Sequence, residues 1–147
     1  MKLLDLYEWI AGSMSDFAKP FQENEALFNQ AKSFWRHLES FSIILVLLFI
    51  IIGIIMAVLY YWLYNNKPGR HYMPTHWLLF WAVTFVMGFV ITFLFEYAVA
   101  QPRLDGAVML EVKIALGNGI YSSILYLVIS IVWCNALPTN AFRIFKK

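Results

Sequence analysis

The stretch that decides the fold is FSIILVLLFIIIGIIMAVLYYWLY, which runs from Phe41 to Tyr64. It contains no charged residue and no proline, and it is mostly Ile, Leu and Val. A helix rises about 1.5 Å per residue, so about 20 apolar residues cross the hydrocarbon core of a bilayer. The length of the run and the absence of a turn signal favour a helix over a pair of buried strands. The sequence therefore predicts a membrane-spanning helix over residues 41–64.

Two further runs lack Asp, Glu, Lys and Arg, one from His71 to Phe95 and one from Ile114 to Phe142. The segments WLLFWAVTFVMGFVITFLFEYAVA and ALGNGIYSSILYLVISIVWCNAL fall largely within these runs, and both are long enough to span. We expect spans near 77–99 and 116–137. The Gly-Asn-Gly triplet at 117–119 is typical of a helix start or a kink. The chain is thus predicted to be an all-α integral membrane protein with three transmembrane helices.

The composition supports this fold class and excludes several functions. Of the 147 residues, 61% are hydrophobic and 14% are charged, whereas soluble domains are about 45–50% apolar and about 25% charged. The net charge of +2 leaves no basic surplus for nucleic acid. The chain has no phosphate loop, dinucleotide-binding turn or nucleophile elbow, and no convincing pair of catalytic side chains. We therefore predict a non-enzymatic protein without a cofactor.

Residues 1–40 are predicted to form one or two amphipathic helices before the spans. In MKLLDLYEWIAGSMSDFA, apolar side chains recur at helical spacing, at Leu3, Tyr7, Ile10, Met14 and Phe17. Pro20 is expected to end this segment. Asn24 is expected to cap a second helix, which runs on into the first span. The apolar stripe of this second helix consists of Leu27, Ala31, Phe34 and Leu38.

The charges in residues 1–40 bear on what this segment contacts. Six acidic residues stand against four basic ones. Helices that bind anionic lipid are usually basic, so this balance favours protein contact over the membrane surface. We expect residues 1–40 to dock on a partner or a neighbouring subunit, with the membrane surface as the alternative.

One face of the predicted second span is small or polar. Its members recur every four residues and are Thr84, Gly88, Thr92 and Glu96. A carboxylate at membrane depth is costly and suggests function. Because Glu96 lies late in its span, we favour a carboxylate that is solvated near the headgroups or paired with a basic residue. The basic candidates are Arg36, Arg103 and Lys113. An ion pathway or proton relay is the alternative.

The other two spans carry similar faces. In the third span, the small residues are Ala115, Gly119 and Ser123. A polar stripe beside them consists of Asn118, Ser122, Tyr126 and Ser130. The first span contributes the small residues Gly53 and Ala57. Such faces pack helices against each other, within a chain or between chains. Lining of a water-filled pore is the alternative.

The ends of the spans give hints about orientation. The aromatic residues that close the first span are predicted to lie at headgroup level, and they are Tyr60, Tyr61, Trp62 and Tyr64. Five basic residues and no acidic one lie in the following loop and the C-terminal tail, namely Lys67, Arg70, Arg143, Lys146 and Lys147. Four basic residues lie near the spans on the other side. We expect a plasma or bacterial inner membrane with the C-terminus on the cytoplasmic side.

These patterns predict a non-enzymatic integral membrane subunit that oligomerises or anchors a larger membrane complex. Its partners would be the lipid bilayer and either further copies of the chain or other subunits. One alternative is a pore or ion channel, such as a membrane-depolarising effector, lined by the polar stripes of the second and third spans. Another is a membrane enzyme or a metal-dependent protein centred on His71, His76 and Cys134, although their spacing matches no common metal motif.

Overall fold

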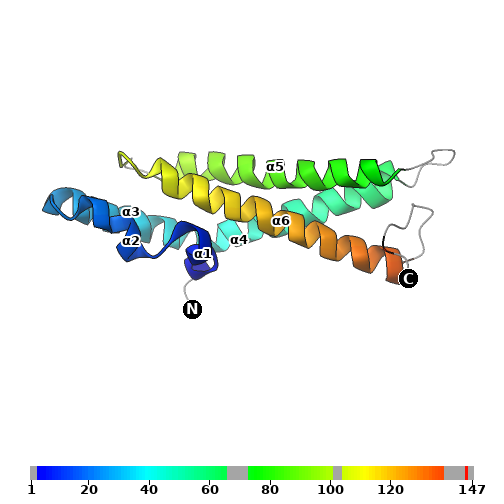
Figure 1. Cartoon of the computed structure of the whole chain (residues 1–147), viewed down its shortest axis with the longest axis horizontal. Coiled ribbons are helices and arrows are strands. Elements are labelled where there is room, and N and C mark those ends of the chain that lie inside the picture. Colours follow the sequence, from blue (N-terminus) through cyan, green and yellow to red (C-terminus); the bar gives the residue numbers. More distant parts are fainter. Residues whose placement is uncertain (1–2, 66–72, 101–103, 138–144, 146–147) are drawn as a thin grey trace.

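The computed structural model describes residues 3–65, 73–100, 104–137 and 145. In these ranges, all regular secondary structure is helical. Three long helices lie side by side along the molecule (Figure 1): α4 (Ser42–Val58) with the π-helical turn η3 (Leu59–Tyr64), α5 (Pro74–Val99) and α6 (Val108–Ala136). Each is long and apolar enough to cross a membrane. The predicted all-α class with three membrane-spanning helices is thereby confirmed.

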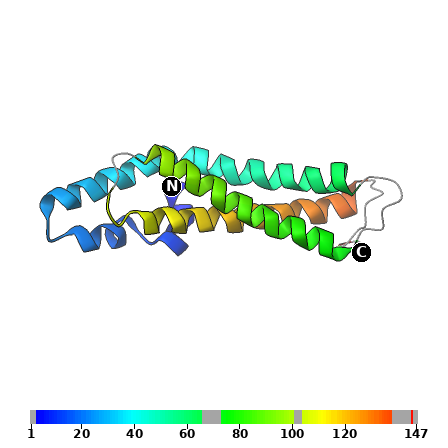
Figure 2. The same ribbon diagram turned by 90° about the horizontal axis from the view of Figure 1, so that it is seen from above.

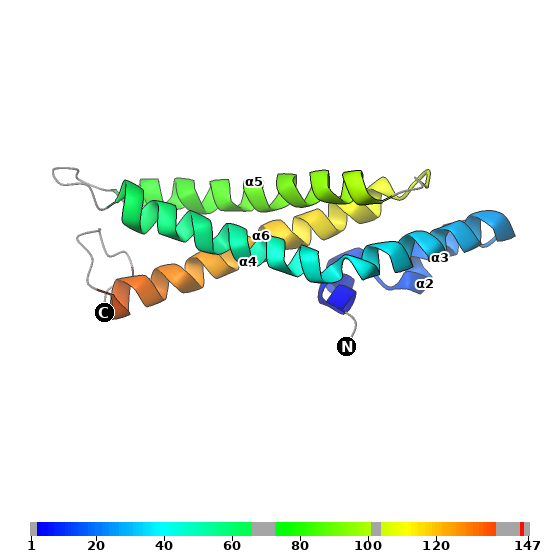
Figure 3. The same cartoon turned by 180° about the vertical axis from the view of Figure 1, so that it is seen from behind.

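The amino-terminal segment lies at one end of the three-helix bundle, with its first turns alongside α6 and the rest extending beyond the bundle (Figure 2). Its elements are η1 (Leu3–Tyr7), α1 (Glu8–Ala11), α2 (Met14–Ala18), η2 (Lys19–Phe21) and α3 (Glu25–Ser40). The chain runs outward through α2, reverses direction and returns along α3 (Figures 1 and 2). Only Phe41 separates α3 from α4, and the two helices meet there at a bend (Figure 3). The expected continuation into the first span is confirmed.

The expectation of one amphipathic helix over residues 1–18 is wrong. The segment breaks at Gly12, whose φ of 80° suits a residue without a Cβ. Ser13 then caps α2, because its hydroxyl accepts from the backbone N–H of Asp16 and the carboxylate of Asp16 accepts from the backbone N–H of Ser13. The last α-helix of this segment ends at Ala18, and Pro20 follows in the short turn η2, in agreement with the predicted end of the segment. The apolar periodicity persists across the break at Gly12.

The second predicted helix matches α3 closely. The Asn24 side chain accepts hydrogen bonds from the backbone N–H groups of Ala26 and Leu27, at 3.0 and 3.3 Å, so the predicted cap is confirmed. The buried members of the predicted stripe are Ala31, Phe34 and Leu38. Leu27 is 40% exposed, because it lies in the first turn, away from the bundle.

Two apolar clusters form the core. One joins the amino-terminal segment to the ends of the long helices, and it includes Phe34, Trp35, Leu104, Leu110 and Ile114. The other lies at the opposite end and contains Ile52, Met56, Tyr60, Tyr61 and Tyr126. The prediction that the tyrosines at 60 and 61 face the headgroups is therefore wrong, since they are 0% and 1% exposed. Trp62 is 65% exposed and faces outward.

The third long helix begins earlier than predicted. It starts at Val108 rather than near residue 116, because its first two turns pack their apolar side on the amino-terminal segment. Gly117 and Gly119 consequently lie within a continuous helix and do not start it. The second helix begins at Pro74, three residues before its predicted start.

Several residues used to argue orientation or chemistry lie outside the described residues. They are Lys67, Arg70, His71, Arg103, Arg143, Lys146 and Lys147. The outer faces of the long helices are apolar where they are described. Exposed positions include Ile51 and Ile55 on α4, Val86 on α5 and Val128 on α6. Such a surface suits a lipid environment.

Candidate functional site

The small and polar stripes predicted for the spans meet inside one chain. Every residue of these stripes is buried: Gly53, Ala57, Thr84, Gly88, Thr92, Glu96, Ala115, Asn118, Gly119, Ser122, Ser123, Tyr126 and Ser130. The stripe of α5 packs on α6, and the small residues of α4 face α6 from the other side. Both polar faces are thus turned toward the interior of the bundle.

Close approach of the helices depends on their glycines. A Cβ placed on Gly88 would lie 2.6 Å from Ser122 Oγ and 3.0 Å from Gly119 Cα. A Cβ on Gly119 would lie 2.9 Å from the backbone oxygen of Phe85. A Cβ on Gly53 would lie 3.0 Å from the side chain of Leu125. At the α5–α6 crossing, backbone atoms are among the nearest neighbours of both Gly88 and Gly119, so a larger residue forces the two helices apart.

Most hydroxyl groups of the stripes are satisfied within their own helices, although the hydroxyl of Tyr126 is buried without a hydrogen-bond partner among the described residues. Four of them donate to the backbone oxygen four residues earlier, at 2.7–2.9 Å, and these are Thr84, Ser122, Ser123 and Ser130. Ser130 also accepts a hydrogen bond from the indole of Trp77 at 3.0 Å. The stripes therefore need neither water nor a second chain to satisfy these four hydroxyl groups.

Asn118 connects three elements at one end of the bundle. Its Nδ2 donates to the backbone oxygen of Leu45 on α4 at 2.9 Å and to Thr92 Oγ1 on α5 at 2.8 Å. Its Oδ1 accepts from the hydroxyl of Tyr7 at 2.5 Å. Asn118, Thr92 and Tyr7 are all fully buried. One amide thus links α4, α5 and η1 to α6.

The amino-terminal segment is attached to α6 by a second set of hydrogen bonds. The Trp9 indole donates to the hydroxyl of Tyr121 at 2.7 Å, and that hydroxyl donates to the backbone oxygen of Leu6 at 2.5 Å. Burial raises the pKa of the Tyr7 hydroxyl, and the nearby Glu96 and Tyr121 raise it further. Tyr7 therefore keeps its proton at neutral pH and remains a hydrogen-bond donor to Asn118.

Glu96 lies one turn after Thr92, in the interior of the same end. It is 0% exposed, and neither carboxylate oxygen has a hydrogen-bond partner among the described residues. The interpretation as a carboxylate solvated near the headgroups is therefore wrong. In the described part of the chain it forms no ion pair with Arg36 or Lys113, and Arg103 lies outside that part.

The metal hypothesis receives no support from the described residues. Cys134 is fully buried, and its Sγ lies 3.5 Å from the hydroxyl of Tyr61. The imidazole of His76 packs edge-on against the ring of Tyr64, with 5.6 Å between the ring centroids. No group of three or more His, Cys, Asp or Glu side chains gathers within the described ranges. His71, the third proposed ligand, lies outside them.

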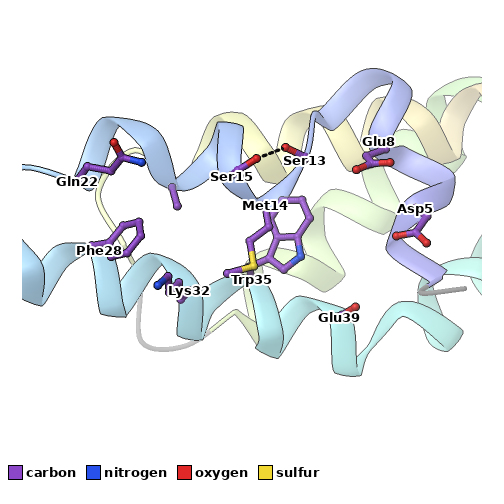
Figure 4. Close-up of a pocket in the computed structure, with 11 residues that line it drawn as sticks. Asp5, Glu8, Ser13, Met14, Ser15, Gln22, Phe28, Lys32, Trp35 and Glu39 are labelled. Carbon is purple, nitrogen blue, oxygen red and sulfur yellow. Dashed lines mark hydrogen bonds between the residues drawn. The ribbon is translucent and has the colours of Figure 1, made fainter.

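A pocket of about 480 Å³ opens between the amino-terminal turns and α3. Figure 4 shows Met14 and Trp35 facing each other across it, with Phe28 and Lys32 further along α3. The carboxylates gather toward one end of the pocket and are Asp5, Glu8 and Glu39. The pocket thus has an apolar floor and a predominantly acidic rim.

Local hydrogen bonds fix the upper wall of this pocket. Ser13 Oγ lies 2.7 Å from Ser15 Oγ and donates to the Asp16 carboxylate at 2.6 Å. These contacts hold the turn between α1 and α2 that carries the wall. The hydrogen bonds from the Ser13 hydroxyl and backbone N–H lower the pKa of the Asp16 carboxyl. Asp16 therefore stays ionised at neutral pH and keeps the cap of α2 intact.

Comparison with protein-family models, with curated protein sequences and with solved structures finds no match for this chain. Its function is consequently argued from its own residues and geometry.

Two parts of the candidate site escape sequence reasoning. The sequence indicates Tyr7 only as a member of an apolar stripe, although a hydroxyl on such a stripe is a signal that it needs a buried partner. The pocket is also missed, because it is built from turns separated by the break at Gly12. The sequence signal that points to the pocket is the excess of acidic residues in residues 1–40. This excess does not indicate which of the carboxylates line the rim of the pocket.

Proposed function

We propose that this protein is a non-enzymatic integral membrane subunit that holds a partner protein at one face of a membrane. The bundle of α4, α5 and α6 is the anchor, and the amino-terminal segment is the docking module. The observation that carries this proposal is the pocket between the amino-terminal turns and α3. It lies beyond the three helices that can cross a membrane, so a partner in the aqueous phase can reach it.

The lining of the pocket indicates the chemistry of the partner. Its volume of about 480 Å³ accommodates a few side chains of a protein segment. Met14 and Trp35 suit an apolar anchor, whereas the exposed carboxylate of Glu8 on the rim suits Lys or Arg. The occupant we propose is therefore a basic amphipathic segment of another protein. An anionic lipid headgroup is disfavoured by the acidic rim.

The packing of the stripes favours a membrane anchor over an oligomer or a pore whose chains associate through these stripes. The small residues of α5 and α6 are already used within one chain, as Gly88 against Gly119 illustrates. A pore lined by the same stripes would require α5 and α6 to separate and to exchange their mutual contacts for water. We therefore place the pore second to the anchor.

Binding of a synthetic peptide tests the docking proposal. The probe is a fluorescent helical Lys/Leu peptide, added to the full chain in nanodiscs of zwitterionic lipid and followed by anisotropy. We expect Glu8→Lys to weaken binding by about fivefold, since it reverses a rim charge. The matched control is Glu23→Lys, an exposed carboxylate of the same segment that does not line the pocket.

The outcomes separate the two candidate functions. Binding that is equal for the wild type, both variants and empty nanodiscs refutes the docking proposal. Ion flux through proteoliposomes of the wild type, absent from empty liposomes, supports the pore instead. A flux-free wild type that binds the peptide through its acidic rim supports the anchor.

A further inference from the structure

Glu96 has no role in the docking proposal, yet its placement is costly. It lies near the end of α5 that meets the amino-terminal segment, and its side chain is 0% exposed. Both carboxylate oxygens are buried and lack a hydrogen-bond partner among the described residues. An ionised carboxylate normally accepts several hydrogen bonds, so this environment does not suit the charged form.

The groups around Glu96 do not compensate a negative charge. Both Nδ2 protons of Asn118 are already used, by Leu45 and Thr92. On η1, the hydroxyl of Tyr7 is also committed, because it donates to Asn118 Oδ1. The Asn118 amide and the Tyr7 hydroxyl thus satisfy each other and their other partners, and no described group donates a hydrogen bond to Glu96.

The charged and titratable groups around Glu96 also disfavour its ionised form. The facing group on α6 is the carboxyl of Glu111, which is 4% exposed and repels a second negative charge. On α3, His37 Nε2 lies 3.0 Å from the backbone oxygen of Val99 rather than at Glu96. On α4, the backbone oxygen of Leu45 accepts from Asn118 and carries no titratable proton. None of these groups stabilises an ionised Glu96.

We propose that Glu96 is a proton-binding site, held as a neutral carboxylic acid inside the bundle at neutral pH. The burial, the unpartnered oxygens and the facing carboxyl of Glu111 all favour the uncharged form over the ionised one. The ligand is a proton, since a metal ion would require further oxygen ligands that the described neighbours do not offer. This site is separate from the docking pocket, whose lining does not include Glu96.

Infrared spectroscopy of the full chain in nanodiscs tests the proposal. A protonated carboxyl has a carbonyl stretching band that an ionised carboxylate lacks. We expect this band at neutral pH in the wild type, its loss in Glu96→Gln and its gradual loss as the pH rises. Glu23→Gln is the matched control, because it removes an exposed carboxylate outside the three-helix bundle, and it should leave the band in place.

Dicyclohexylcarbodiimide provides a second, site-resolved measurement. The protonated carboxyl transfers its proton to a carbodiimide nitrogen, and the carboxylate oxygen then bonds to the central carbon. Rearrangement gives an N-acylurea, so the adduct gains the mass of one carbodiimide and nothing leaves. We expect mass spectrometry to locate a single adduct on the peptide containing Glu96, and no adduct there in Glu96→Gln.

The two measurements also define failure. If Glu96→Gln removes only bands of ionised carboxylate at neutral pH, the proposal is wrong. Carbodiimide adducts confined to exposed carboxylates such as Glu23 and Glu25 overturn it as well. Neither result bears on peptide docking, so the failure of one proposal leaves the other standing.

Discussion

At the scale of single residues, Asn118 connects three other elements of the protein to α6. Its amide holds the backbone of α4, the hydroxyl of Thr92 on α5 and the hydroxyl of Tyr7 on η1. All of these partners are buried, so removing the amide leaves polar groups without water to replace it. Its importance follows from its position between elements and not from its residue type.

Replacing Asn118 by Leu should destabilise the protein. We expect a loss of about 1–3 kcal/mol, because the Tyr7 hydroxyl and the Leu45 carbonyl lose their partner inside the bundle. Thermal unfolding in detergent, followed by tryptophan fluorescence, measures the effect. Asn135→Leu on the same helix is the control, because Asn135 is exposed. Equal midpoints for the two variants would contradict the role of Asn118.

At the scale of elements, the crossing of α5 over α6 depends on residue size. Gly88 faces Gly119, and backbone atoms of α6 are among the nearest neighbours of Gly88. The helices therefore pack at a distance that only very small residues allow. The stripes predicted from the sequence indicate which face of each helix makes this contact, since the small and polar residues of each stripe recur every four residues.

Gly88→Leu should break this crossing. The added side chain meets the backbone of Gly119, which cannot move aside without displacing α6, so we expect a cost of about 1–3 kcal/mol or more. Val90→Leu, on the exposed side of α5, is the matched control and should have little effect. Thermal unfolding and the monomer fraction in gel filtration report the difference. A Gly88→Leu variant as stable as the control would show that the helices do not pack as closely as described.

At the scale of the whole molecule, the amino-terminal segment covers one end of the bundle. It is attached there by the Tyr7–Asn118 and Trp9–Tyr121 hydrogen bonds and by the shared apolar cluster. Its outer side carries the acidic pocket. The molecule is thus an apolar bundle with a polar module fixed to one end, which is the arrangement expected of a membrane anchor with a docking surface.

Loss of the Tyr7 hydroxyl should loosen this module without unfolding the bundle. We expect Tyr7→Phe to cost about 1 kcal/mol locally and to speed hydrogen exchange in residues 3–18 by about fivefold. Mass spectrometry of the exchanged peptides measures it, and peptides from α5 provide the internal reference. Exchange that rises equally in α5 would mean that the module does not open on its own.

If all three helices that are long and apolar enough to span cross the membrane, the pocket and the end of α6 lie on opposite sides of it. With the C-terminus on the cytoplasmic side, Ser15→Cys should react with an impermeant maleimide in right-side-out vesicles, and Asn135→Cys only in inverted ones. Background labelling should be low, because the single native cysteine, Cys134, is fully buried. Labelling of both variants from one side would contradict three spans. The reverse pattern would invert the orientation.

Much of the fold follows from local sequence properties. The charge-free runs predict α4, α5 and most of α6, since about 20 apolar residues suffice to cross a bilayer. The first two turns of α6 are missed because Glu111 and Lys113 resemble loop residues, although the carboxyl of Glu111 is buried by tertiary packing. The break at Gly12 is missed for a related reason, since apolar periodicity continues through it.

Sequence patterns also indicate only part of the candidate sites. Periodicity alone indicates that Thr92 and Glu96 share a face with Gly88, and that Asn118 belongs to a polar stripe of its own. It does not indicate which faces meet, because small and polar stripes serve equally well for packing within a chain, packing between chains or lining a pore.

The sequence by itself determined the three long apolar helices, the capped helix that leads into them and the acidic character of residues 1–40. These features depend on composition and on the helical repeat, which act over a few turns of chain. Only the tertiary structure decided that the stripes of α5 and α6 close on each other, that Tyr7 reaches Asn118, and that Glu96 is left buried without a partner. Such contacts join residues far apart in the chain, and their energies depend on distances that no local pattern encodes.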